Sequence, residues 1–176
     1  MTLHVPPTLI DIEMSVTNLT ALPPRIEIAW SPLLTFYIEH AMLTEVPPSL
    51  LKMKLDDWSL IGNDIATLPP MTTLRSGSFM VALANNPIES LTRGDGTLPR
   101  VAYMNLAHTK LRELPDWLEE TASEQVYLYG TPFCDALSDE EKAQRYGVTA
   151  KLSCLYTDQR QSGRYPLALN TKRRKL

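Results

Sequence analysis

The sequence has little cysteine, glycine or aromatic content and no long apolar run. Among 176 residues there are two cysteines, seven glycines and 7% aromatic residues. Two cysteines are too few for a disulfide scaffold, and without C-x-x-C pairs or clustered histidines they match no structural zinc motif. No stretch approaches the roughly 18 consecutive apolar residues that a membrane-spanning helix needs. We therefore expect no membrane-spanning segment in this chain.

Excess positive charge and catalytic motifs are also missing. The formal net charge is −3, whereas affinity for nucleic acid depends on lysine and arginine contacts with phosphate. The sequence contains no phosphate-binding glycine loop, dinucleotide fingerprint, serine-hydrolase elbow or H-E-x-x-H motif. We therefore expect no nucleic-acid partner, and no catalytic residues, metal or cofactor within this chain.

Apolar residues and proline are abundant, and the prolines follow a repeat. The chain is 44% hydrophobic with 14 prolines, which suits one folded domain. The prolines lie in the segments Leu22–Pro24, Val46–Pro48, Leu68–Pro70 and Leu114–Asp116. Three residues before each segment stands an apolar residue, and the series 19, 43, 65, 88, 111 and 133 has spacings of 22 to 24 residues. The chain therefore has an internal repeat of about 23 residues.

Each repeat contains the string L-x-x-L-x-L-x-x-N-x-L, and 22 of its 24 leucine positions over residues 9–133 are apolar. The exceptions are Ser78 and Ser123. This string and its period resemble the leucine-rich repeat family, in its typical, plant-like subclass. The resemblance implies an α/β solenoid with a curved parallel β-sheet on its concave face.

The family pattern divides the chain into four parts. We expect a degenerate N-terminal turn at residues 1–8, six repeats at 9–133, a helical C-terminal cap at 134–156 and a flexible basic tail at 157–176. Alternation in Val126–Tyr129 independently predicts one short strand per repeat. Within the cap, Ser138–Glu141 forms a capping box that opens a short helix. The run Lys172–Lys175 in the tail is a nuclear signal, a juxtamembrane lipid anchor or a solvated end.

The asparagine position of the repeat must satisfy backbone groups that the bend leaves buried. Asparagine occurs there only at Asn63 and Asn86, and the other repeats carry Thr17, Ala41, Thr109 and Thr131. Threonine does part of this task through its hydroxyl, but alanine does not. We therefore expect the repeat around Ala41 to be the loosest, or to be repaired by a water.

Cys134 and Cys154 begin and end the cap segment. A disulfide between them would hold the cap over Phe133, and closing a loop of this length contributes about 3 kcal/mol. Two buried free thiols are the alternative, because the sequence does not fix the redox compartment. The chain is extracellular if it derives from a receptor ectodomain, and cytoplasmic otherwise.

The outward positions of the predicted strands are the expected binding surface. The first three repeats place four carboxylates there, whereas the last two place tyrosines. We expect these contact residues: Glu13, Tyr37, Glu39, Asp57, Tyr103, Asn105, Tyr127 and Tyr129. A basic part of a protein or peptide would lie on the carboxylates and an apolar part on the tyrosines. The alternative is that β-propensity alone places such residues on strands.

Two classes of function fit this surface. Resemblance to repeat ectodomains of receptor-type proteins favours a non-enzymatic module that binds a protein or peptide, within a receptor-like or scaffold protein. The alternative is a sensor or regulatory segment of a larger enzyme, such as a receptor-type kinase, whose catalytic domain lies outside this chain. A repeat protein with no dedicated ligand is a further alternative.

Overall fold

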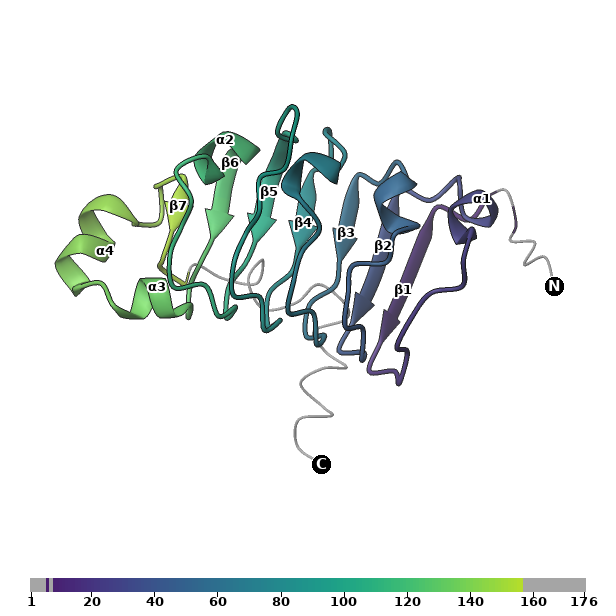
Figure 1. The fold of residues 1–176 in the computed structure, drawn as a ribbon, viewed down its shortest axis with the longest axis horizontal. Coiled ribbons are helices and arrows are strands. Elements are labelled where there is room, and N and C mark those ends of the chain that lie inside the picture. The colour runs from purple at the N-terminus through teal and green to yellow at the C-terminus, as the bar shows by residue number, and fades with distance from the viewer. Residues whose placement is uncertain (1–5, 7, 157–176) are drawn as a thin grey trace.

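The computed structural model describes residue 6 and residues 8–156. The predicted N-terminal turn at 1–8 falls almost wholly outside this range, and the predicted basic tail at 157–176 falls wholly outside it. Within the range, seven strands form one open parallel sheet whose order follows the chain (Figure 1). The fold is therefore α/β with an all-parallel sheet and few helices.

The elements are short, and irregular chain connects them. The strands are β1 (Asp11–Ser15), β2 (Thr35–Glu39), β3 (Asp57–Ser59), β4 (Met80–Ala82), β5 (Val101–Asn105), β6 (Ala122–Tyr127) and β7 (Leu152–Ser153). The helices are α1 (Ile26–Ala29), η1 (Leu50–Lys52), η2 (Met71–Thr73), α2 (Leu118–Thr121), α3 (Pro132–Asp135) and α4 (Asp139–Arg145). None of these helices is long and apolar enough to cross a bilayer.

The register of β1 to β5 is the one that the repeat predicts. Asp11 pairs with Thr35, Thr35 with Asp57, Asp57 with Met80, and Met80 with Tyr103. Because alternate residues of a strand share a face, the apolar positions of the repeat all turn to one side of the sheet. We call this side the inner face and the opposite side the outer face.

The inward position predicted for Ser123 is wrong. Val101 of β5 pairs with Ala122, whereas Tyr103 pairs with Gln125, so the register shifts between the two pairs. An extra residue of this kind is a bulge, and it changes which side chains face inward. Ala122 is consequently 1% exposed in the core, and Ser123 is exposed.

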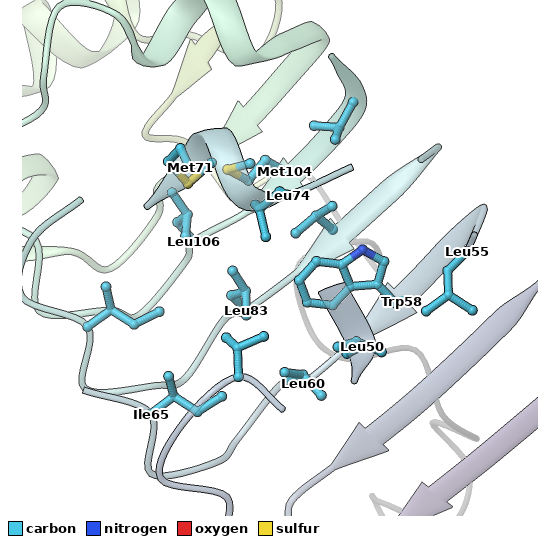
Figure 2. Close-up of a cluster of buried hydrophobic side chains, with 14 of the residues drawn as sticks. Leu50, Leu55, Trp58, Leu60, Ile65, Met71, Leu74, Leu83, Met104 and Leu106 are labelled. Carbon is cyan, nitrogen blue, oxygen red and sulfur yellow. The ribbon is translucent and has the colours of Figure 1, made fainter. Parts of the chain in front are cut away.

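The inner face carries one continuous hydrophobic core. Trp58, Leu83 and Leu106 come from three successive turns of the chain and belong to the same cluster (Figure 2). The buried apolar residues of the helices belong to this cluster too, namely Ile26, Leu50, Met71, Leu118 and Cys134. The described helices therefore bury their apolar side chains on the inner face.

Two buried asparagines tie successive turns together. The Asn63 side-chain nitrogen donates to the carbonyls of Ile38 and Leu60 at 2.8 and 2.9 Å, and its oxygen accepts from the Leu43 amide at 3.1 Å. Ile38 and Leu43 flank Ala41, where the sequence predicts unpaired backbone. The structure thus shows that the asparagine of the following turn supplies these hydrogen bonds.

Asn86 repeats this arrangement one turn later. Its side-chain nitrogen donates to Leu60 and Leu83 at 2.8 and 2.9 Å, and its oxygen accepts from the Ile65 amide at 3.1 Å. Both asparagines are buried, at 4% and 2% exposure for Asn63 and Asn86. Because both side-chain amides are buried and hydrogen-bonded to the backbone of two turns, they join neighbouring turns to each other.

The chain bends in a left-handed conformation just after each of its first six strand segments. The residues there have φ between 52° and 70°: Val16, His40, Gly62, Asn85, His108 and Gly130. A side chain at Gly62 would collide with the imidazole of His40, and one at Gly130 would collide with His108. Glycine at these two positions leaves space for the histidine one turn earlier.

The C-terminal cap contains the predicted helix and one unpredicted strand. Ser138 and Glu141 form the capping box of α4, so the prediction of a short helix there is confirmed. Cys134 and Cys154 form a disulfide with a Cα–Cα distance of 5.5 Å. The bridge joins α3 to the residue that follows β7, and β7 pairs with β6. Tyr146 packs edge-on against Phe133 at 5.4 Å.

Replacing Asn63 by alanine is expected to lower the free energy of unfolding by about 3 kcal/mol, because buried backbone groups of two turns lose their partners. Asn18→Ala is the matched control: Asn18 is exposed, and its loss is expected to cost less than about 0.5 kcal/mol. Urea unfolding measures both. Equal destabilisation by the two changes would contradict the structural role of Asn63.

Candidate functional site

Strand pairing places the predicted contact residues on the outer face. Glu13 pairs with Tyr37, and Asn105 pairs with Tyr127. Glu39 and Asp57 occupy outward positions of β2 and β3, Tyr103 one of β5, and Tyr129 follows Tyr127 by two residues. The sheet thus brings together an acidic end at β1–β3 and an aromatic end at β5–β6.

The acidic end is electrostatically coupled. Partial burial raises the pKa of the Glu13 carboxyl above its ordinary value of 4.5, and the negative charges of Asp11, Glu39 and Asp57 raise it further, in that order. Glu39 is 0% exposed and accepts a hydrogen bond from the Ser59 hydroxyl. We call Asp11, Glu13, Glu39 and Asp57 the acidic patch. Their mutual repulsion favours the approach of a cation.

Apolar side chains fill the centre of the outer face. A second hydrophobic cluster, separate from the inner core, contains Ile61, Met80, Ala82, Ala84, Ala107 and Tyr127. Each of these residues is at most 3% exposed. Ile61 and Met80 were not among the contact residues predicted from the sequence. The sequence feature that could have identified them is a large apolar side chain at an outward position of the repeat.

Stacked rings form the aromatic end. The rings of Tyr103 and Tyr127 are nearly parallel at an interplanar angle of 6°, with centroids 6.2 Å apart. Phe79 meets Tyr103 edge-on at 5.3 Å and is 51% exposed. It was not among the contact residues predicted from the sequence. Its position, one residue before β4, is a variable position of the repeat string, so the pattern carried no signal for it.

Tyr129 and Asn105 differ from each other in what they offer a ligand. Tyr129 is 37% exposed and contacts the rings of His108 and Tyr156 at 5.2 and 5.3 Å. Asn105 is fully buried, and its side-chain oxygen accepts from the Ala107 amide at 3.1 Å. Asn105 therefore supports the turn after β5, whereas Tyr129 presents its ring at the surface.

Much of the outer face is not open surface. Tyr37, Glu39, Asn105 and Tyr127 are 6%, 0%, 0% and 3% exposed, and none of the four lacks an interaction partner in the folded chain. The repeat predicted outward positions correctly but gave no indication that they are shielded from water. Asp11 and Glu13 at β1 remain exposed.

Two concave regions of the described chain lie away from the predicted contact residues. A cavity of about 300 Å³ lies between the Thr20–Arg25 segment and the Pro47–Ser49 segment, and one of about 680 Å³ lies beside Arg93, Arg100 and Lys151. Over residues 8–156, no group of three or more histidine, cysteine or acidic side chains is arranged to hold a metal ion. The outer face is therefore the place where the predicted contact residues meet.

Replacing Glu13 by glutamine is expected to raise stability at pH 7. A raised pKa means that the fold favours the protonated carboxyl, so the associated stability is present below pH 4.5 and is lost as the pH rises through the raised pKa. The neutral amide avoids this loss. The difference in free energy of unfolding between Glu13→Gln and wild type should therefore disappear at pH 4.

Urea unfolding at the two pH values measures this difference. Glu89→Gln, which changes an exposed carboxylate away from the strands, serves as the control and is expected to show no such dependence on pH. A Glu13→Gln protein that is no more stable than wild type at pH 7 would refute the coupling within the acidic patch.

Comparison with known proteins adds no family to this description. No protein-family model matches the chain. A search of curated proteins also gives no significant match. The functional interpretation therefore rests on the residues of the outer face and on their geometry.

Proposed function

We propose that the chain is a leucine-rich repeat solenoid that recognises a protein or peptide partner through its outer, concave face. The repeat of about 23 residues, the sheet order that follows the chain and the paired asparagines Asn63 and Asn86 support this assignment of the fold. Such a scaffold presents one strand per turn, so its contact residues form rows across the sheet. The module belongs to a receptor-like or scaffold protein and carries no catalytic function of its own.

Segregation of charge and aromatic area on one face is the observation that carries this proposal. The acidic patch lies on β1–β3, while Tyr103, Tyr127 and Tyr129 lie on β5–β6 or just after it. Carboxylates steer a basic segment and fix its orientation. Tyrosine rings bury area and keep a polar contact through the hydroxyl. The complementary partner has a basic part next to an apolar part.

Exposure indicates where a partner makes its first contact. Asp11 and Glu13 are exposed at the β1 edge, and Phe79 and Tyr129 are 51% and 37% exposed. The two acidic residues attract a basic segment over a distance of about a Debye length, 8 Å at physiological ionic strength. The rings then supply apolar area.

The disulfide supports an oxidising compartment for this module. Cys134 and Cys154 are both buried, at 1% and 2% exposure, and bonded to each other. Disulfides form and persist mainly in secreted and extracellular proteins. We therefore place the chain outside the cytosol, in agreement with a receptor-like role.

A random-peptide display library screened on the purified full chain tests the proposal. Selected peptides are expected to combine clustered lysine or arginine with adjacent apolar residues. Their affinity for the Asp11→Lys, Glu13→Lys double variant should fall about tenfold, because two attractive charges become repulsive. Isothermal titration calorimetry with the synthetic peptides measures this loss.

The matched control is Glu89→Lys with Glu113→Lys, which makes the same charge change on exposed loop carboxylates. It should leave the affinity within about twofold of wild type. A library that enriches no basic and apolar consensus would overturn the proposal. So would selected peptides that bind both double variants with equal affinity.

A further inference from the structure

A cavity of about 680 Å³ lies at the amino-terminal ends of β5, β6 and β7, which are neighbours in the sheet (Figure 1). Arg100 directly precedes β5, Ala122 begins β6 and Lys151 directly precedes β7, and all three line the cavity. Its volume falls in the range of about 300 to 1,000 Å³ that is usual for small-molecule sites. None of the predicted contact residues lines it, so it is a separate candidate site.

The lining of this cavity is mainly cationic. Arg93, Arg100 and Lys151 line it together with one carboxylate, that of Glu120. The described chain as a whole is acidic, because residues 8–156 contain eleven lysines and arginines against nineteen aspartates and glutamates. Three of these eleven cations therefore gather in one cavity. Their like charges repel each other, and an anion placed between them would remove this repulsion.

No carboxylate in the part of the chain that the structure describes forms an ion pair with these three cations. The ion pairs between described residues join Lys52 to Glu27 and Lys142 to Asp139. The three cationic residues of the cavity are also exposed. Their charged groups are therefore available to an anion from solution.

Backbone hydrogen bonds fix the position from which each cationic side chain starts. The Arg93 carbonyl accepts from the Thr72 amide at 3.0 Å, and the Arg100 carbonyl accepts from the Gly77 amide at 2.8 Å. The Lys151 carbonyl accepts from an amide of β6 at 2.7 Å. Because the backbone beneath the three cations is already ordered, binding a ligand costs less conformational entropy than it would on a mobile loop.

The residue types in the lining suit phosphate or sulfate groups. An arginine guanidinium presents a planar fork of N–H donors that matches the oxygens of these groups, and a lysine ammonium adds a compact charge. The hydroxyls of Thr97 and Ser123 also line the cavity and supply further donors. Since β5 and β7 are two strand steps apart, the backbones of Arg100 and Lys151 lie about 10 Å from each other. A ligand with several anionic groups therefore makes more of these contacts than a single phosphate ion does.

We propose that this cavity binds a small polyanion, a phosphate or sulfate ester with several charged groups, through Arg93, Arg100 and Lys151. Glu120 opposes the negative charge of the ligand and accepts a hydrogen bond from a hydroxyl of the ester. The acidic patch lies on β1–β3, towards the other end of the sheet, so the two sites attract ligands of opposite charge. This inference does not depend on the proposed recognition of a protein or peptide by the outer face.

Isothermal titration calorimetry of the full chain with tripolyphosphate and with a trisulfated heparin disaccharide tests the proposal. The Arg100→Gln, Lys151→Gln double variant is expected to bind about tenfold more weakly, because two charged hydrogen bonds are lost. Glu120→Gln is expected to bind about twofold more tightly, because one repulsive charge is removed. Binding of only one of the two probes would support the site and assign its ligand to phosphate or to sulfate esters.

Two control variants remove the same amount of positive charge elsewhere. Lys110→Gln with Arg112→Gln changes two exposed cations that do not line the cavity, and Lys172→Gln with Arg173→Gln changes the basic run near the C-terminus. Both should keep the affinity within about twofold of wild type. The proposal would be overturned if neither probe bound at millimolar concentration, or if either control lost as much affinity as the cavity variant.

Discussion

A parallel β-sheet needs both of its faces shielded from water, and this requirement connects the fold of this chain to its function. Parallel sheets occur almost only where both faces are covered. Short helices and returning segments cover the inner face over a core that includes Trp58 and Leu83. The outer face carries a second apolar cluster around Met80. The proposed recognition of a partner and the protection of the sheet therefore depend on the same surface.

Hydrogen bonds at the turns make that surface regular. Asn63 and Asn86 join successive turns through hydrogen bonds to buried backbone groups. Residues in the left-handed conformation, such as His40 and Gly62, bend the chain at equivalent positions. Because every turn bends alike, the outward residues lie in rows, and charge and aromatic area separate along the sheet. Replacing either asparagine is therefore expected to alter the geometry of the proposed binding face as well.

The sequence predicted those features that depend on spacing. Strand register from β1 to β5 and the capping box at Ser138 follow from periodicity and from local hydrogen-bonding chemistry. The bulge that exchanges Ser123 for Ala122 depends on packing between two turns. Strand β7 lies in the cap, beyond the last copy of the repeat string. The burial of the outward residue Met80 could not be predicted from the sequence, because the repeat pattern describes only the inward side chains. The same limit explains why Phe79, at a variable position of the string, was missed.

The central claim, that the outer face is covered in the folded chain, is tested most directly by the rate of methionine oxidation. Met80 on the outer face and Met104 in the inner core are both 0% exposed, whereas Met42 is 49% exposed. Hydrogen peroxide treatment of the full chain, followed by peptide mass spectrometry, gives each rate. The account predicts that Met80 reacts at least about tenfold more slowly than Met42 and close to Met104. A Met80 rate equal to that of Met42 would contradict it.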